Sequence, residues 1–453
     1  TRLLAPLHRA MAAAATLTGK RFGLLVASSV VATSVIVASA MTATNGTGPL
    51  AALLGRSLAA DNAPAVSEPE AEETAPESPS PDRSQPSSPA PASSSVTPAP
   101  VSEPGPQPEP QPEPEPEQAT PEEPAPELGP VKHVFVVSVA SPGYEAAFGT
   151  ASQMPYLSGT LRPQGVLLTN FMLLSQAALP NSLAAISGQP PNPATDQECP
   201  TYDEFPATAR VSRKGVVAGS GCVYPVTTLS LADQLGSARL SWRAYMEGMI
   251  DEAGRPANCV HPEPGAAETP PPGGYSSKLN PFAYFHSLLD LGDCAANDVP
   301  LSSLEKDLRR VETTASYTYV APTPCNAGFA GTCAPGAAEG PAAADAFLAQ
   351  WVPKVLSSPA YKQDGLLIVT FGGLSPPAGA GASGEAPAPV SLRTGTLLVS
   401  NFLSPGATDG AAYDPYSLLR SSEEIFGLPT LAEAGRAKVR TFSPALSASN
   451  GGD

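Results

Sequence analysis

The order of apolar and polar positions after residue 130 is typical of an α/β domain. The segment His133–Val139, HVFVVSV, is a nearly continuous apolar run of the kind that is buried on both faces of a parallel sheet. Further strands are predicted at Val166–Asn170, Trp242–Met246, Ser316–Val320, Gly365–Phe371 and Gly395–Ser400. Helices are predicted between them at Asn181–Ser187, Ser230–Ala238, Ser302–Val311, Ala342–Leu356 and Tyr416–Phe426. This alternation of strands and helices predicts one domain with a mostly parallel sheet.

A different pattern, apolar and free of charge, occupies residues 22–43, FGLLVASSVVATSVIVASAMTA. A helix of this length would span roughly 33 Å, which is enough to cross the core of a bilayer. Because basic residues precede it, residues 1–21 are expected to stay in the cytoplasm while the rest is exported. The segment is expected to be either a retained signal anchor or a cleavable signal peptide with Ala38-Ser39-Ala40 as its cleavage motif.

Residues 44–130 are predicted to form a disordered, acidic, proline-rich linker. Between Asp61 and Pro130 there are 15 acidic residues and one basic residue, Arg83, so this stretch carries −14 of the formal net charge of −17. The low pI therefore describes the linker and does not indicate a basic ligand for the folded part. Alternating Pro and Glu residues resist helix formation, and their like charges extend the chain. A spacer that holds a domain away from a membrane would have this composition.

Six cysteines lie in the C-terminal part of the chain: Cys199, Cys222, Cys259, Cys294, Cys325 and Cys333. An even number of cysteines outside the cytoplasm predicts disulfides, and among 15 possible pairings we favour nearest neighbours. Metal binding is the alternative, but no Cys-x-x-Cys pair or histidine cluster accompanies them. Lys and Arg are sparse and not interleaved with aromatic residues, so no nucleic-acid surface is predicted.

Several segments follow one another in the order of a known family. They are VKHVFVVSV with Tyr144 and Phe148-Gly149, GVLLTNF and LPNSLAAISGQ within 165–189, LADQLGSARLSWRAYMEGM at 231–249, NPFAYF at 280–285, AFLAQWVPKVLSSPAY at 346–361 and YSLLRSSEEIFGLP at 416–429. This series resembles the bacterial phosphoesterase family of phospholipases C and certain acid phosphatases, in the alkaline-phosphatase-like superfamily. The resemblance implies a three-layer α/β/α domain over 131–435, with 436–453 as a C-terminal tail.

The resemblance also implies where a nucleophile and metal ligands should lie, and this sequence has other residues there. Ala140 and Ser141 replace a Glu-Asn pair, whereas Gln176 and Ala178 replace a histidine and the nucleophile. In the segment PTPCNAGFA, three acids and a histidine are replaced by Thr323, Ala327, Phe329 and Ala330. The acids of the late strand are replaced by Gly372 and Gly373, and two further histidines by Leu279 and Pro415. Asn181 and Asn326 keep the family residue.

Hydrolysis of this kind needs an activated nucleophile and cations that stabilise the transferring phosphoryl group. Alanine and glycine side chains offer no ligand atom, so the sequence predicts a catalytically degenerate pocket without a catalytic residue, metal or other cofactor. Asn181 would either donate a hydrogen bond to a ligand or stabilise a turn. Asp233 and Glu247 match family positions that look structural.

We therefore expect an envelope-tethered, non-catalytic homologue that binds or scaffolds an envelope ligand or protein. It would lie on the extracytoplasmic face of the membrane, held by its N-terminal helix, or be secreted to the cell envelope. The alternative is an active phosphoric-ester hydrolase with a relocated site, for which Glu385 or Asp414 would supply carboxylates. A purely structural spacer protein is a third reading, but it does not explain why a whole domain is retained.

Overall fold

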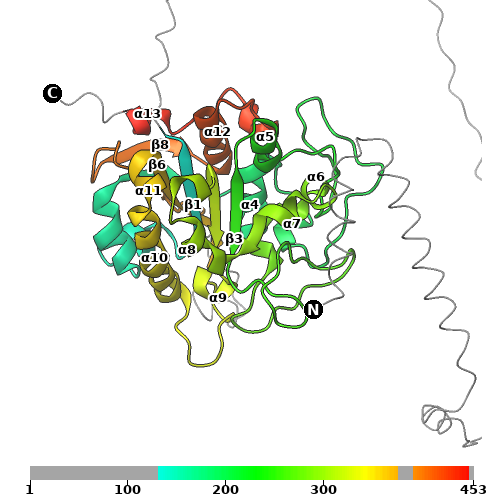
Figure 1. The fold of residues 1–453 in the computed structure, drawn as a ribbon, viewed down its shortest axis with the longest axis horizontal. Helices are drawn as coiled ribbons and strands as arrows, with labels where there is room; N and C mark the ends of the chain where they lie inside the picture. The colour runs from blue at the N-terminus through cyan, green and yellow to red at the C-terminus, as the bar shows by residue number, and fades with distance from the viewer. Residues whose placement is uncertain (1–130, 376–390, 448–453) are drawn as a thin grey trace, which may run out of the picture. The chain divides into compact units, whose positions relative to one another are not determined.

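The computed structural model describes residues 131–375 and 391–447. It confirms the predicted α/β class: eight strands form one sheet in the order β4-β3-β5-β1-β6-β7-β2-β8 (Figure 1). Strand β7 is antiparallel to both of its neighbours, and every other pair is parallel. The strands are β1 His133–Ser141, β2 Val166–Phe171, β3 Trp242–Met246, β4 Asp298–Pro300, β5 Tyr317–Ala321, β6 Gly365–Leu374, β7 Thr396–Val399 and β8 Thr408–Tyr413.

Helices connect the strands and cover the sheet. The α-helices are α3 Tyr144–Phe148, α4 Ala178–Ser187, α5 Leu231–Ser237, α6 His286–Leu289, α7 Asp293–Asn297, α8 Leu304–Asp307, α9 Pro324–Ala327, α10 Gly340–Ser357, α11 Pro359–Asp364, α12 Pro415–Phe426 and α13 Ser443–Ser447. Single turns of 3-10 or π-helix lie at Tyr156–Leu161, Arg162–Gln164, Thr195–Gln197, Ser277–Leu279, Pro281–Tyr284, Leu301–Ser303, Val311–Thr313 and Ala432–Gly435.

Strand β1 shows why the sheet needs helices on both faces. All nine of its residues are buried, and successive side chains of a strand point to opposite faces. Val134 and Val136 pack with residues of α4, α5 and α12, whereas Phe135 and Val137 pack with residues of α10 and α11. The three predicted layers are therefore present, with two apolar cores separated by the sheet.

One predicted helix is wrong in its extent. Residues 302–311 were expected to form a single helix, but α8 ends at Asp307. The hydroxyl groups of Thr313 and Thr314 both donate to the carbonyl oxygens of Asp307 and Arg310. These side chains satisfy the carbonyls that a longer helix would have used, so the chain turns there instead.

Residues 436–447, predicted to belong to a C-terminal tail, pack against the preceding part of the domain. Phe442 is fully buried and packs in the same core as α4 and α12. Its backbone N–H donates to the Ser421 hydroxyl over 2.8 Å, and the Arg420 guanidinium donates to the Arg436 and Val439 carbonyls. Only residues 448–453 of the predicted tail lie outside the described part of the chain.

The three N-terminal segments of the prediction, 1–21, 22–43 and 44–130, likewise lie outside the described residues. Among the helices of residues 131–375 and 391–447, none is long and apolar enough to cross a membrane.

The preferred disulfide pairing is confirmed. Cys199 bonds to Cys222, Cys259 to Cys294 and Cys325 to Cys333. No cysteine of the chain is left free, since all six lie in the described domain.

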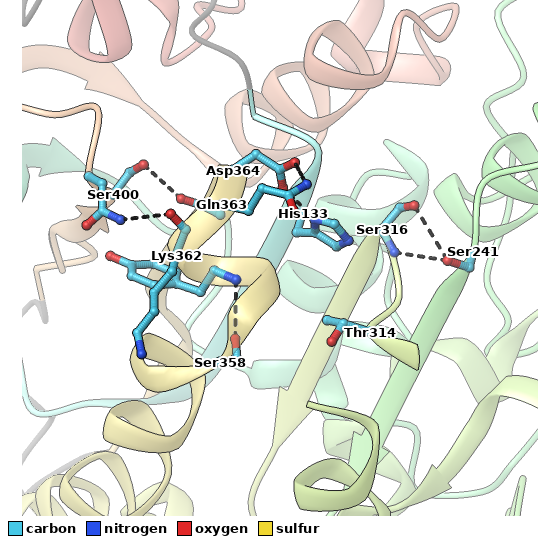
Figure 2. A network of polar contacts seen from close by, with 12 residues as sticks. His133, Ser241, Thr314, Ser316, Ser358, Lys362, Gln363, Asp364 and Ser400 are labelled. Atoms are coloured by element: carbon cyan, nitrogen blue, oxygen red, sulfur yellow. Dashed lines mark hydrogen bonds and ion pairs between the residues drawn. The ribbon is translucent and has the colours of Figure 1, made fainter. Parts of the chain in front are cut away.

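At the N-terminal ends of β1 and β6, a buried histidine and a buried carboxylate form a hydrogen bond (Figure 2). The Nδ1 atom of His133, the first residue of β1, lies 2.5 Å from the Oδ1 atom of Asp364, which ends α11. The Gln363 side chain donates to the other carboxylate oxygen over 3.0 Å. This contact joins the N-terminal ends of β1 and β6, far from the C-terminal ends where the predicted pocket lies.

Candidate functional site

The predicted pocket residues gather at the C-terminal ends of the central strands, where α/β proteins usually place their sites. Ala140 and Ser141 end β1 and pair with Gly373 and Leu374 of β6. Helices α4, α9 and α12 begin at this edge with Ala178, Pro324 and Pro415. The topology of the sheet therefore brings the predicted segments together at one end.

Asn181 organises the turn that leads into α4. Its Oδ1 atom accepts from the backbone N–H groups of Leu174 and Ser175, at 2.8 and 3.2 Å. Its Nδ2 atom donates to the carbonyl oxygens of Ser175 and Ala177, at 2.9 and 2.6 Å. All of these partners are backbone groups and Asn181 is buried, so the geometry favours the turn-stabilising alternative.

Ala178, the position that the family resemblance assigned to the nucleophile, is bonded through its backbone to an acid from elsewhere in the chain. The backbone N–H of Ala178, the first residue of α4, donates to the carboxylate of Glu198, and the Leu179 N–H donates to it over 3.3 Å. A helix N-terminus attracts anions through its free N–H groups and its dipole. Glu198 therefore places an internal carboxylate where an external oxyanion would otherwise bind.

Backbone geometry holds Glu198 in this place. Glu198 and its neighbour Cys199 both adopt positive φ angles, 56° and 45°, which non-glycine residues rarely do. Cys199 is at the same time fixed by its disulfide with Cys222. Burial raises the pKa of the Glu198 carboxyl, against the lowering effects of the two N–H donors and of nearby Lys278.

The end of β6 leaves no room for the acid side chains that the family resemblance implied there. A Cβ atom on Gly373 would lie 2.8 Å from the backbone N and Cα atoms of Ala178. A Cβ atom on Gly372 would lie 2.9 Å from the Ser138 hydroxyl oxygen. In addition, the Leu374 N–H donates to the Gln176 carbonyl over 2.9 Å. The segment before α4 thus packs directly on β6, and the missing side chains leave no open site.

Neutral hydroxyl groups line the small space that remains beneath the contact between β6 and the start of α4. The buried Tyr319 hydroxyl of β5 interacts with Ser138 of β1 and Ser182 of α4, and burial raises the pKa of its phenol. Two small cavities meet at these residues and at Gly372, each about 10 Å³ in volume. That volume is at the lower limit for one water molecule. One cavity includes Ala178, Ala327 and Phe329, and the other includes Asn181 and Pro415.

The α9 side of the site is held by Glu247. The Glu247 carboxylate accepts from the Thr323 backbone N–H and from the Asn326 Nδ2 atom, each over 2.9 Å. The Thr323 hydroxyl in turn caps α9 by accepting from the Asn326 N–H. Glu247 is structural, as its sequence position indicated. Ala330 follows α9 and contributes to neither small cavity.

Two other acids that were candidates for structural or catalytic roles are engaged in helix caps. Asp233 forms a capping box with Ser230 at the start of α5. Asp414 does the same with Ser417 at the start of α12, and burial raises the pKa of its carboxyl. Glu385, the other proposed donor for a relocated site, lies outside the described residues.

A larger cavity lies on a different face of α12. It measures about 400 Å³ and is lined by Arg420, Glu424, Leu428, Thr430, Val439 and Thr441. Because Arg420 follows Leu418 by two residues, it projects from roughly the opposite side of the helix. The 436–447 segment, predicted to be a tail, supplies part of this wall.

Few side chains within residues 131–375 and 391–447 are arranged to hold a metal ion. One group of acid, histidine or cysteine side chains has ligand atoms within 4.8 Å of one another: Cys259, Cys294 and Asp298. Its two sulfur atoms are bonded to each other. This group lies away from the predicted pocket, whose positions offer no equivalent cluster in the part of the chain that the structure describes.

Glu198 is the residue of this site that the sequence did not reveal. It lies 20 residues after Ala178, in a segment rich in Pro that matches no quoted family motif. The only local signal is its position beside a cysteine expected to be bridged. Neither a periodic pattern nor a spacing rule links it to the start of α4.

Comparison with solved structures finds distant likenesses. A protein in the alkaline phosphatase superfamily from Vibrio parahaemolyticus is 13% identical, with 70% of this chain and 72% of that chain covered and a TM-score of 0.42. The phosphonate monoester hydrolase SpPMH from Silicibacter pomeroyi is 10% identical, with 70% and 76% covered and a TM-score of 0.38. The PsFucS1 sulfatase from Pseudoalteromonas sp. is 12% identical, with 66% and 68% covered and a TM-score of 0.38.

Among functionally curated proteins, none matches this chain. The model of one family, described as the Phosphoesterase family, matches residues 147–429. The matched range contains every predicted pocket position from Gln176 to Pro415 and also Glu198. It begins after Ala140 and Ser141, the two positions at the end of β1.

Proposed function

Because the chain belongs to the phosphoesterase family, we propose that it uses the family's fold as a non-catalytic binding or scaffolding domain of the cell envelope. The observation that carries this proposal is the bond between Glu198 and Ala178. A phosphoryl group approaching the start of α4 would meet a carboxylate already bonded to the N–H groups there. Charge repulsion and the loss of free donors both act against its binding.

The packing at the end of β6 supports the same proposal. Gly373 lies against the Ala178 backbone so closely that a carboxylate side chain there would require the α4 segment to move. Metal-assisted hydrolysis needs a space for the ion, for the substrate oxygens and for the nucleophile. The two cavities of about 10 Å³ offer none of these.

The location outside the cytoplasm is supported by the cysteines and by the residues that precede the domain. Three disulfides with no free thiol are typical of oxidising compartments. Residues 22–43 are apolar and uncharged, and a proline-rich stretch with a strong excess of acidic residues follows at 61–130. We propose that these segments tether the domain to the extracytoplasmic face of the membrane.

Hydrolysis assays test the proposal directly. The purified full chain is incubated with p-nitrophenyl phosphate and with phosphatidylcholine, in the presence of Mg²⁺, Ca²⁺, Mn²⁺ or Zn²⁺. We expect no turnover above the rate in protein-free buffer. Metal-dependent turnover that disappears in Asp414→Ala, with the fold of that variant verified by circular dichroism, would instead establish the relocated hydrolase site.

A binding role also predicts a result that can be measured directly, which is retention of the domain on cell envelopes. The domain, released from residues 1–130 by proteolysis in the proline-rich segment, should be retained on isolated cell envelopes in a saturable manner. Retention that is not competed by excess unlabelled domain would contradict a specific binding role. In that case the remaining reading is a passive spacer protein.

A further inference from the structure

Among the three disulfides, the bridge between Cys259 and Cys294 has a distinct environment. Both cysteines of each other bridge are buried, whereas Cys259 is only partly buried. The Oδ2 atom of Asp298 lies 3.8 Å from the Cys294 sulfur. We propose that Cys259–Cys294 is a thiol–disulfide exchange site, in which Asp298 transfers a proton to and from the Cys294 sulfur. The co-reactant is a small thiol or the thiol of a reducing protein.

Asp298 is placed for proton transfer and only partly occupied by other contacts. It is fully buried at the start of β4. Its Oδ2 atom accepts from the Asn280 Nδ2 atom over 2.7 Å, while its Oδ1 atom has no hydrogen-bond partner. A buried carboxylate with one bare oxygen is costly. The cost is smaller when the carboxyl is protonated, and a protonated carboxyl can donate to a sulfur.

Exchange at this bridge begins with an external thiolate. A thiolate attacks the sulfur of Cys259, the partly exposed residue of the bridge, and forms a mixed disulfide with it, and the Cys259–Cys294 bond breaks. The electron pair of that bond passes to the Cys294 sulfur, which takes the proton of Asp298 and leaves as a neutral thiol. A second thiol then displaces Cys259 from the mixed disulfide. In the reverse direction the Asp298 carboxylate removes the Cys294 proton, which generates the attacking thiolate.

Hydrogen bonds that do not involve sulfur hold the two cysteines together. The Cys259 backbone N–H donates to the Asp298 carbonyl over 3.0 Å. The Asn258 side chain donates to the Ala295 carbonyl of α7 over 2.9 Å. These contacts flank the bridge on both of its segments and are independent of its oxidation. The reduced thiols therefore remain neighbours, and the bridge can form again within the molecule.

Titratable groups around Asp298 come from several elements. Cys294 lies on α7, and Tyr275 from the preceding loop shares the Asn280 Nδ2 atom with Asp298. Burial raises the pKa of the Tyr275 phenol, and the charges of Asp298 and Glu268 add to this effect. The Glu268 carboxylate also accepts from the Ser277 N–H. Burial raises the pKa of Asp298 to about 7, against the lowering effect of the Asn280 hydrogen bond. Near neutral pH the carboxyl is therefore able both to give and to take a proton.

The order in which the bridges open tests the proposal in the native full chain. Dithiothreitol is added without denaturant, samples are alkylated over time, and peptide mass spectrometry identifies the modified cysteines. We expect Cys259 and Cys294 to be modified about tenfold faster than the other four cysteines. Earlier opening of Cys199–Cys222 or Cys325–Cys333 would overturn the proposal.

The role of Asp298 is tested by its pH dependence. Once the rate of opening is divided by the thiolate concentration, it should fall as the pH rises through 7, because the protonated carboxyl is lost. Asp298→Asn keeps an acceptor for Asn280 but no acidic proton, and should be about tenfold slower with a flat profile. Asp293→Asn, an exposed acid beside Cys294, is the matched control and should behave as the wild type.

If Asp298→Asn fails to fold, the wild-type profile still decides. A normalised rate that does not change between pH 5.5 and 8.5 would show that Asp298 does not transfer the proton. A profile that falls through pH 7, together with selective opening of this bridge, supports both parts of the proposal.

Discussion

The carboxylate of Glu198 accepts the backbone N–H of Ala178 and so occupies the N-terminus of α4. The family resemblance assigns the nucleophile position to Ala178, so under the proposed function this acid would stand in the way of an anionic ligand. The two residues are brought together by a left-handed turn and a disulfide at Cys199. This anion is supplied by the chain and acts as a helix cap.

Replacing Glu198 should therefore destabilise the domain. In Glu198→Ala the N–H groups of Ala178 and Leu179 lose their acceptor, and the free energy of unfolding should fall by about 1–2 kcal/mol. Urea denaturation with disulfides intact measures the change. The exposed neighbour Gln197→Ala serves as the control and should change the stability little. An unaltered Glu198→Ala midpoint would mean that the cap is not formed in solution.

A single methyl group at Gly373 should also be costly. In Gly373→Ala the new Cβ would meet backbone atoms of Ala178 at 2.8 Å, so the α4 segment must shift. We expect a loss of about 1–3 kcal/mol, as in other overpacked cores. Gly236→Ala on α5 has open space around its Cβ position and should be neutral or stabilising. Equal effects of the two substitutions would contradict the close packing described at β6.

Stability should decrease as the pH rises toward 8. Burial raises the pKa of Asp298 to about 7 and that of Glu423 to about 8. Both groups therefore bind protons more tightly in the folded state than in the unfolded chain. Their contribution is complete below about pH 4 and is lost as the pH rises through 7 to 8. The free energy of unfolding should be roughly 1–3 kcal/mol higher at pH 5.5 than at pH 8.5.

Glu423 offers the cleaner variant for this measurement. Its Oε1 atom accepts from the Leu431 N–H over 2.7 Å, while its Oε2 atom is buried without a partner. Glu423→Gln removes the titration and should reduce the pH dependence. Glu424→Gln changes the exposed acid next to it on α12 and should leave the dependence as it is. A stability that rises between pH 5.5 and 8.5 would argue against both raised pKa values.

Chelation should leave the melting temperature unchanged. Over residues 131–375 and 391–447, the one group with metal-ligand spacing contains two sulfurs that are joined in a disulfide. Without a bound ion in the folded state, removal of metal has no linked free energy to withdraw. Differential scanning calorimetry with and without EDTA measures this. A drop of several degrees that is reversed by Ca²⁺ or Zn²⁺ would reveal a site.

The His133–Asp364 pair should contribute more than a surface ion pair. Both side chains are largely buried, 11% and 6% exposed, so removal of one partner leaves the other without compensation. Asp364→Asn should cost about 1–3 kcal/mol, because the buried His133 ring nitrogen loses its carboxylate partner. Lys362→Ala, an exposed side chain on the same helix, is the control. A double-mutant cycle with His133→Gln isolates the pairwise energy, and a coupling near zero would contradict the interaction.

The core strands could be predicted because each is a continuous apolar run that can be recognised without reference to the rest of the chain. Strands β1 and β6 are continuous apolar runs, and both form within a few residues of the expected bounds. Strand β8 was not predicted. It lies at the sheet edge with its residues 408–412 exposed or partly exposed, and its sequence TDGAAY has no apolar run. Burial on both faces of a long strand produces a readable pattern, whereas the exposed edge strand β8 and the buried three-residue strand β4 do not.

The parts of the site that could not be predicted from the sequence were missed for a different physical reason. Helix α4 begins at Ala178, three residues before the predicted start, and the acid that caps it lies 20 residues further along the chain. The family resemblance placed Ala140, Ala178, Ala327 and Gly372 together; the last three line one small cavity, whereas Ala140 does not. It did not indicate that Gly373 packs on the Ala178 backbone. Contacts between distant segments depend on the whole fold, and local sequence carries no record of them.

The position of His133 determines how the domain responds to mechanical load. Any tension in the chain before residue 131 is applied to the first residues of β1, which lies between β5 and β6 in the middle of the sheet. Because both neighbours are parallel to β1, a pull along the strand loads its evenly spaced ladder bonds together in shear. The His133–Asp364 contact and the bond from the Lys132 N–H to the Asp364 carbonyl resist first. Force applied at this point therefore acts on the middle of the sheet and not on an edge strand.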